Sequence, residues 1–174
     1  MQELTHYLNG AHVKGTSGRF ADVYNPATGE VQAKVPLAGE AELDQAVKYA
    51  MAAQPAWAAV NPQRRARVMM KFVDLLNRDM DKLAEALSRE HGKTLPDAAG
   101  DVQRGLEVVE YCIGAPELLK GDFTDSAGPG IDMYSMRQPL GVSAGITPFN
   151  FPAMIPMWMF APAIVCGNAF ILKP

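Results

Sequence analysis

The chain has 174 residues, with 16 Lys plus Arg against 19 Asp plus Glu and a formal net charge of −3 at pH 7. Hydrophobic residues make up 48% and charged residues 20%, which is normal for a globular domain and too apolar for a disordered chain. The absence of a basic excess argues against nucleic-acid binding, because such binding depends on neutralising many phosphates. One basic cluster, Arg64, Arg65 and Arg67, is typical of a solvated helix face.

The first third of the chain predicts short strands joined by tight turns. Asn9-Gly10 separates two short apolar runs, and this dipeptide is a strong local indication of a β-hairpin because both residues tolerate positive φ. A second turn over residues 25–30 links expected strands at 20–24 and 31–35. We expect these strands to lie at a sheet edge and to carry no catalytic centre.

A helical period follows from Glu40. Four helices are expected: one that ends at Pro55, one capped by Asn61 with Pro62 in its first position, one that ends at Gly92, and one over residues 96–119. The last of these places Val102, Leu106 and Val109 on one face. We therefore expect one helical layer with an apolar core.

No charged residue occurs between Arg137 and Lys173. A loop and then a strand are expected over residues 121–138, with Gly128-Pro129-Gly130 as the turn. Residues 140–146 form an apolar run without alternation, as expected of a parallel strand buried on both faces. Residues 151–166 predict a helix and residues 169–172 a second strand. A membrane span is the alternative, but prolines and glycines interrupt the stretch, so we favour the opening unit of an α/β sheet.

Other patterns predict no site. Gly92-Lys93-Thr94 has the end of a phosphate-binding loop, but Leu87 stands where its first glycine is required. His6, His12 and His91 have no metal-ligand spacing, so we expect no metal. Cys112 and Cys166 lie in apolar surroundings and are expected to be reduced core thiols. Residues 1–10 have no apolar leader, which favours a cytoplasmic protein.

Asn150 lies where the first parallel strand gives way to the following helix. Ligands of open α/β sheets bind outside the carboxyl ends of the strands, where helix N-termini supply unpaired N–H groups. The Asn150 amide could donate a hydrogen bond to a developing oxyanion. It could equally cap the helix, which is a common use of asparagine. The spacing alone leaves both interpretations open.

Several stretches in order resemble the NAD-dependent aldehyde dehydrogenases. They are Tyr7-Leu-Asn-Gly10, Asn25-Pro-Ala-Thr-Gly-Glu30, Glu90-His-Gly-Lys-Thr94, Pro148-Phe-Asn-Phe-Pro152 and Gly167-Asn-Ala-Phe-Ile-Leu-Lys-Pro174. Within that family the chain looks most like the CoA-acylating methylmalonate-semialdehyde dehydrogenases. Residues 145–152, 156–160 and 100–110 carry that closer resemblance.

The resemblance implies an α/β fold: the N-terminal part of an aldehyde dehydrogenase, with edge strands and a helical layer that lead into the first βαβ unit of a Rossmann-like NAD-binding sheet. Residues 1–174 would form an incomplete N-terminal portion of the NAD-binding domain, without the catalytic domain. The implied reaction oxidises methylmalonate or malonate semialdehyde with NAD and coenzyme A. Decarboxylation would yield propanoyl-CoA or acetyl-CoA.

The resemblance also implies roles for matching residues. Asn150 would be the catalytic oxyanion-hole amide, Thr147 and Phe149 would touch NAD largely through the backbone, and Lys173 would bond the adenosine ribose. Arg104 would hold the substrate carboxylate, which suits a bidentate guanidinium. The alternative for Arg104 is an exposed arginine on a helix face.

The family nucleophile is a cysteine farther along the chain than Pro174, and neither Cys112 nor Cys166 stands at its position. The 174 residues alone are therefore expected to be inactive. Two alternatives stay open: an ordinary hydrolytic aldehyde dehydrogenase, and an inactive chain that acts as an interaction module. By analogy with the family we expect a homotetramer of the full-length enzyme, with no nucleic-acid or membrane partner.

Overall fold

The structure, a computed structural model, describes residues 2–174. Its N-terminal part consists of five short strands, β1 (Gln2–Glu3), β2 (His6–Leu8), β3 (Ala11–Val13), β4 (Phe20–Tyr24) and β5 (Val31–Pro36). β2 and β3 form an antiparallel hairpin, and β1, β5 and β4 form a three-stranded sheet in that order. Asn9 and Gly10 have φ of 50° and 77°, so the predicted hairpin turn is confirmed.

Helices make up the middle of the chain: α1 (Glu40–Ala58), α2 (Pro62–Arg78), α3 (Met80–His91), α4 (Leu95–Ile113) and α5 (Ala115–Leu118). Asn61 caps α2, accepting a hydrogen bond from the backbone N–H of Gln63. Gly92 ends α3 in the left-handed region with φ 86°. Both predicted boundaries are confirmed, whereas the single helix expected over 96–119 is divided at Gly114.

The predicted end of α1 at Pro55 is wrong. The helix continues through the proline to Ala58. Contacts with the end of α6 hold this last turn, since the indole N–H of Trp57 donates to the carbonyl of Ile164 at 2.7 Å and Gln54 donates to the carbonyl of Gly167 at 3.1 Å. Tertiary hydrogen bonds on both sides of Pro55 thus offset the one it removes.

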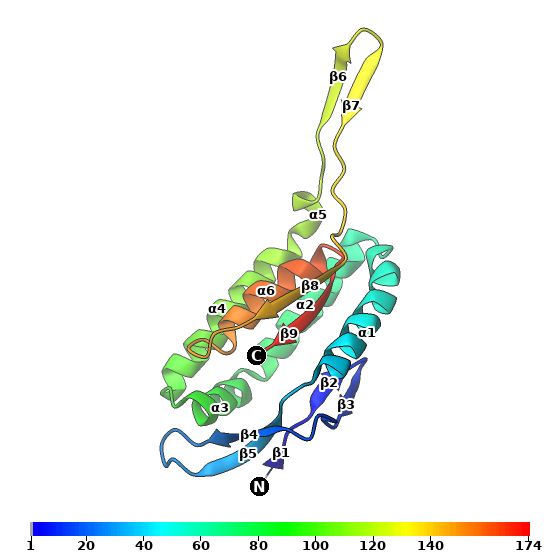
Figure 1. Cartoon of the computed structure of the whole chain (residues 1–174). Helices are drawn as coiled ribbons and strands as arrows, with labels where there is room; N and C mark the ends of the chain where they lie inside the picture. The colour runs from blue at the N-terminus through cyan, green and yellow to red at the C-terminus, as the bar shows by residue number, and fades with distance from the viewer. Residues whose placement is uncertain (1) are drawn as a thin grey trace.

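The segment expected to be a loop and then a strand is a hairpin of two strands, β6 (Phe123–Gly128) and β7 (Ile131–Tyr134). The turn lies where it was predicted, because Gly128 pairs with Ile131 across Pro129-Gly130. The hairpin projects well beyond the helices (Figure 1). All of β7 and most of β6 are exposed.

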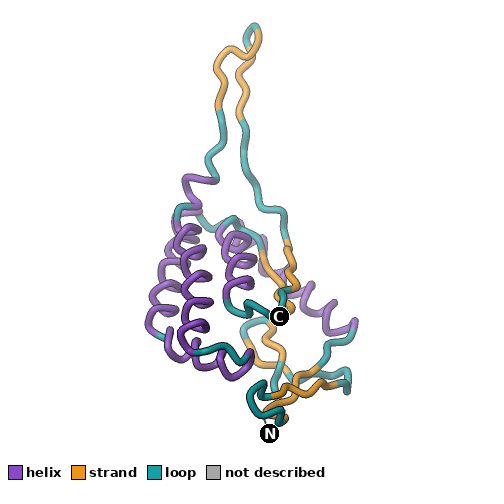
Figure 2. Tube along the Cα trace, turned by 90° about the vertical axis from the view of Figure 1, so that its left-hand side faces the viewer, coloured by secondary structure: helices purple, strands orange, loops and turns teal. Residues whose placement is uncertain are grey.

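The C-terminal part contains β8 (Val142–Ile146), α6 (Met154–Val165) and β9 (Ala169–Lys173). β8 and β9 pair in parallel, which confirms the predicted strand, helix and strand, although α6 begins at Met154 rather than at 151. In Figure 2 the pair lies between α1 and the other helices. The prediction that this strand is buried on both faces is wrong within residues 2–174, since no residue of β8 is fully buried and Ile146 is 76% exposed. The segments of residues 2–174 leave part of its surface uncovered.

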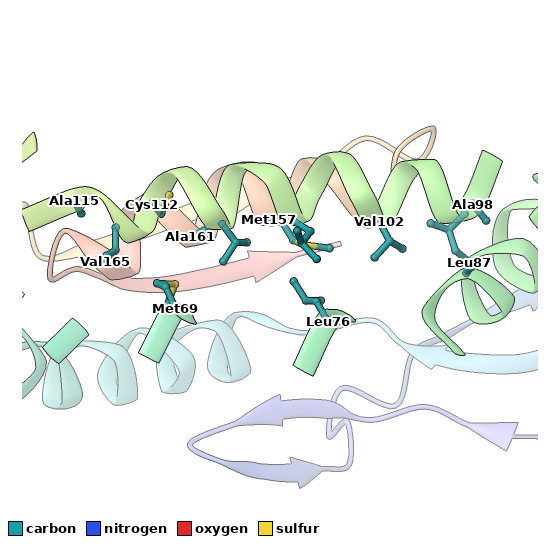
Figure 3. Packing of buried hydrophobic residues seen from close by; sticks show 13 residues of the cluster. Met69, Leu76, Leu87, Ala98, Val102, Cys112, Ala115, Met157, Ala161 and Val165 are labelled. Carbon is teal, nitrogen blue, oxygen red and sulfur yellow. The ribbon is translucent and has the colours of Figure 1, made fainter. Parts of the chain in front are cut away.

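The core lies among the helices, and α4 runs along the length of the cluster (Figure 3). Its buried residues are Met69, Leu76, Ala84, Leu87, Ala98, Val102, Leu106, Val109, Cys112, Ala115, Met157, Ala161 and Val165. The predicted apolar face of α4 is therefore confirmed. Within residues 2–174, none of the helices has both the length and the apolar character that a bilayer crossing requires.

Arg65 corrects the expectation of a solvated basic cluster. Its side chain lies inside the fold, with 4% of the residue exposed. It donates to the carbonyl of Val165 at 2.8 Å and to that of Ala58 at 3.1 Å. Arg64 and Arg67 are exposed, as expected.

Candidate functional site

Four of the predicted site residues lie at the carboxyl edge of the parallel pair. The backbone N–H of Thr147 donates to the carbonyl of Lys173 at 3.1 Å, which continues the β8–β9 ladder. Phe149 and Asn150 follow in the loop of residues 147–153 that leads to α6. Parallel strands therefore bring residues from two separate sequence stretches to one edge.

Asn150 does not cap α6. The residue before the helix is Ala153, and no side chain caps this end. The capping interpretation is therefore wrong, and the side chain of Asn150 stays exposed in the loop. An exposed amide beyond the carboxyl end of a parallel strand is free to donate to a ligand.

The 147–153 loop is held against the α3–α4 junction (residues 91–94). The rings of His91 and Phe149 stack with centroids 4.7 Å apart and planes at 24°. The ammonium of Lys93 lies 4.1 Å from the ring centroid of Phe151. These contacts hold the residues on both sides of Asn150.

A buried carboxylate connects this junction to α6. Asp101 has no exposed surface. Its Oδ2 accepts from the ammonium of Lys93 at 2.7 Å, and its Oδ1 accepts from the backbone N–H of Met154 at 2.7 Å. Charge-assisted hydrogen bonds of this length are strong and directional. Asp101 thus satisfies a backbone donor at the first residue of α6, where the helix itself offers no acceptor.

Local sequence explains the shape of the α3–α4 junction. Gly92 adopts a φ that favours glycine. The hydroxyl of Ser88 donates to the carbonyl of Lys93 at 2.7 Å, and Thr94 caps α4 by accepting from the backbone N–H of Asp97. The stretch Gly92-Lys93-Thr94, which does not match a phosphate-binding loop, is therefore the short connection between α3 and α4, and it places Lys93 beside the 147–153 loop.

Arg104 lies one turn beyond Asp101 on α4 and is exposed. Its carbonyl accepts from the indole N–H of Trp158 at 3.2 Å, so its backbone is tied to α6. Within residues 2–174 its guanidinium forms no ion pair and no hydrogen bond with the four edge residues. The structure thus brings Thr147, Phe149, Asn150 and Lys173 together and keeps Arg104 on a neighbouring helix.

Both cysteines are free, with Cys112 buried and Cys166 half-buried. Burial raises the pKa of the Cys112 thiol to about 11, with a smaller contribution from Cys166. Because the thiolate is the nucleophilic form, Cys112 is unreactive near neutral pH. Among the described residues no three of His, Cys, Asp and Glu are grouped as metal ligands.

Sequence reasoning missed Asp101 and Lys93. A single aspartate on a helix face is normally solvated, and no local pattern marks this one as buried. The helical period that buries Val102 and Leu106 also turns the neighbouring position inward. The role of Asp101 becomes visible only from its partners in the structure, the Lys93 ammonium and the Met154 N–H.

Comparison with known proteins agrees with this fold. Residues 12–174 match the aldehyde dehydrogenase family. The chain belongs to this family, whose members are oxidoreductases.

Three members of the family are closely similar to this chain. A malonate-semialdehyde dehydrogenase of Pseudomonas aeruginosa is 53% identical over 174 residues, which cover 100% of this chain and 35% of the relative. An acylating mitochondrial methylmalonate-semialdehyde dehydrogenase of Arabidopsis thaliana is 52% identical over 171 residues, 98% of this chain and 28% of the relative.

The third is a crystal structure complexed with NAD from Sinorhizobium meliloti 1021, of a protein assigned as a methylmalonate-semialdehyde dehydrogenase. It superposes with a TM-score of 0.99 at 69% identity, over 100% of this chain and 35% of that one. This chain therefore spans about a third of the length of the proteins it resembles.

Proposed function

We propose that the protein containing this chain oxidises malonate or methylmalonate semialdehyde with NAD and transfers the acyl group to coenzyme A. Decarboxylation then gives acetyl-CoA or propanoyl-CoA. The names of the three relatives support the semialdehyde substrate, and the acylating relative supports coenzyme A as the acceptor. We further propose that residues 1–174 are the N-terminal portion of the NAD-binding domain.

The exposed amide of Asn150 is the observation that carries this proposal for the chain itself. It lies at the carboxyl edge of the parallel pair and does not serve the helix that follows. From there it can donate to the oxygen that becomes negative when a thiolate adds to an aldehyde. We therefore assign it the oxyanion-stabilising role.

The residues around Asn150 fit NAD. Lys173 has an exposed ammonium whose contact is the neighbouring Pro174 carbonyl at 2.7 Å, so it can donate to ribose hydroxyls. Thr147 and the exposed ring of Phe149 line the same edge. NAD, when bound, supplies the hydride acceptor. The residues of this chain bind and orient it.

Arg104 is our candidate for the substrate carboxylate, because a guanidinium binds a carboxylate through two parallel hydrogen bonds. Its exposure also fits a solvated arginine, which favours the second candidate function, a hydrolytic aldehyde dehydrogenase without a carboxylate site. Arg104→Leu in the full-length enzyme separates the two. We expect KM to rise steeply for semialdehydes that carry a carboxylate and not for simple aldehydes, with the exposed Arg67→Leu as the matched control.

Equal effects on both substrate classes would remove the role of Arg104. Product analysis tests the acyl acceptor directly: an acylating enzyme forms a thioester that requires coenzyme A, whereas a hydrolytic enzyme releases the free acid without it.

Asn150→Ala tests the central assignment. Removing one oxyanion donor typically lowers kcat by about 100-fold to 1,000-fold, and we expect a loss of that order with little change in NAD affinity. Asn77→Ala, an exposed asparagine on α2, is the control. An unchanged kcat in Asn150→Ala would contradict the assignment.

The 174 residues alone should form no NADH from aldehyde, NAD and coenzyme A, because we place the nucleophilic cysteine outside them. Detectable turnover by the purified chain would contradict this. A homotetramer and a cytoplasmic location remain predictions, and one of the relatives is named as mitochondrial.

A further inference from the structure

The buried pair of Lys93 and Asp101 takes no part in the chemistry assigned above. Asp101 is fully buried, and the Lys93 side chain is 15% exposed. Burying a carboxylate is costly unless it is paired and hydrogen-bonded. Both oxygens of Asp101 are engaged, one by Lys93 and one by the Met154 N–H.

These two residues and the nearby His91 contact the 147–153 loop and its junction with α6 at three points. Asp101 holds the backbone at Met154, where the loop passes into α6. Lys93 lies over the ring of Phe151, and its neighbour His91 stacks on Phe149. Asn150 lies between the two held aromatic residues. Its backbone is therefore fixed from both sides by a junction more than fifty positions earlier in the chain.

A simpler arrangement would satisfy the first N–H groups of α6. A serine, threonine, aspartate or asparagine directly before a helix commonly accepts from its second or third backbone N–H. Here Ala153 occupies that place, and the acceptor comes from α4 instead. The link therefore fixes the loop relative to α4, which a local cap cannot do.

We propose that Asp101 and Lys93 are positioning residues that hold the 147–153 loop on α4, so that the Asn150 amide is presented at the strand edge in one orientation. The proposal rests on the function proposed for Asn150. A misplacement of about 1 Å of a catalytic group can cost on the order of 100-fold in rate, so a loop that carries such a group benefits from a rigid attachment.

Two variants of the full-length enzyme test the link. Asp101→Asn keeps an oxygen for the Met154 N–H and removes the charge that pairs with Lys93. Lys93→Met keeps the length of the side chain and removes the ammonium. Val109→Ala, in the buried face of the same helix, is the control for a general loss of core packing. If Asp101→Asn does not fold, Lys93→Met, whose side chain reaches solvent, carries both measurements below.

Hydrogen exchange tests whether the loop is held, without reference to activity. We expect amides of residues 147–154 to exchange faster in Asp101→Asn and Lys93→Met than in the unchanged enzyme. Val109→Ala should leave this peptide unaltered. Unchanged exchange in both test variants would overturn the proposal.

A double-mutant cycle tests whether the link acts through Asn150. Asp101→Asn alone should lower kcat by about 10-fold to 100-fold, with little change in KM for NAD, and Lys93→Arg should retain more activity than Lys93→Met. Combined with Asn150→Ala, Asp101→Asn should lower kcat no further. Full multiplication of the two losses would overturn the proposal.

The two proposals fail in different ways. If Asn150→Ala leaves kcat unchanged, the role of Asn150 is wrong, while the exchange measurement still decides whether Asp101 and Lys93 hold the loop. If Asn150→Ala lowers kcat and the loop exchanges normally in both variants, the positioning proposal alone is wrong.

Discussion

At the scale of a residue, the buried guanidinium of Arg65 satisfies backbone carbonyls inside the fold. Its guanidinium donates to carbonyls at the C-terminal ends of two helices, those of Ala58 and Val165. Cations are favoured at such ends by the helix dipole. The planar fork of arginine holds five donors in a fixed geometry, whereas a lysine ammonium is a compact charge on a flexible stem.

We therefore expect Arg65→Lys to lower the free energy of unfolding by about 2 kcal/mol, since buried carbonyls lose charged hydrogen bonds. Urea titration of the variant measures this. Arg64→Lys on the exposed side of α2 should unfold at the same urea concentration as the unchanged protein. An unchanged free energy of unfolding in Arg65→Lys would contradict this expectation and would mean that the lysine finds equivalent acceptors.

Cys112 predicts a pH dependence of stability. In the folded protein its pKa is about 11, whereas the exposed thiol of the unfolded chain ionises near pH 9. Between these values the folded state binds more protons, so stability falls as the pH rises from 9 to 11. The decline due to Cys112 is on the order of 2 kcal/mol.

Denaturant titrations at several alkaline pH values measure that decline. Cys112→Ala should show a flatter dependence than the unchanged protein, and Cys166→Ala should retain most of it. The same pH dependence of stability in the unchanged protein and in Cys112→Ala would contradict the raised pKa of Cys112.

At the residue scale, the sequence correctly predicted helix ends that depend only on nearby residues. The cap at Asn61 and the left-handed Gly92 depend only on neighbours along the chain, and both are confirmed. The capping interpretation of Asn150 is wrong for the same reason that Pro55 does not end its helix. At α6 the distant Asp101 accepts from the first backbone N–H, and at Pro55 side chains of α1 donate to carbonyls of Ile164 and Gly167, which are distant in sequence.

At the scale of elements, the close approach of α4 and α6 depends on Gly105. A Cβ at this position would lie 2.8 Å from the sulfur of Met157 and 3.2 Å from the Cα of Met154. The absence of a side chain lets the two helices approach, and with them the buried Asp101 and the start of α6.

Gly105→Ala should therefore destabilise the protein by about 1–3 kcal/mol through overpacking. Gly100→Ala in the same helix is the matched control, because its nearest atom would be Nη1 of Arg104 at 3.9 Å, and alanine is the better helix former by up to about 1 kcal/mol. Thermal unfolding of both variants checks the pair. A stabilising Gly105→Ala would show that Met157 moves aside without cost.

For the whole molecule, the β8–β9 pair determines how the chain behaves on its own. It is a two-stranded sheet in the described residues, with exposed Ile146 on β8 and exposed Leu140 just before it. Unpaired strand edges with apolar side chains favour association with other chains.

We expect the isolated chain to self-associate. Ile146→Lys should reduce this association, because a charged side chain on an edge strand disfavours pairing with another chain. Size exclusion with light scattering measures both. A stable monomer of the isolated chain would contradict the expectation. A defined complex with another cellular protein would favour the interaction-module alternative.

The sequence by itself determined the family, the turns at Asn9-Gly10 and Pro129-Gly130, and the parallel strands with the helix between them, but not β6 or the division of the helix at Gly114. These follow from patterns within a few residues or from stretches that resemble relatives. Only the tertiary structure decided that Arg65 is buried, that Asn150 is free of α6, and that Asp101 and Lys93 hold the loop around it. Such contacts join segments far apart along the chain, and no periodicity records which distant group will satisfy a buried charge.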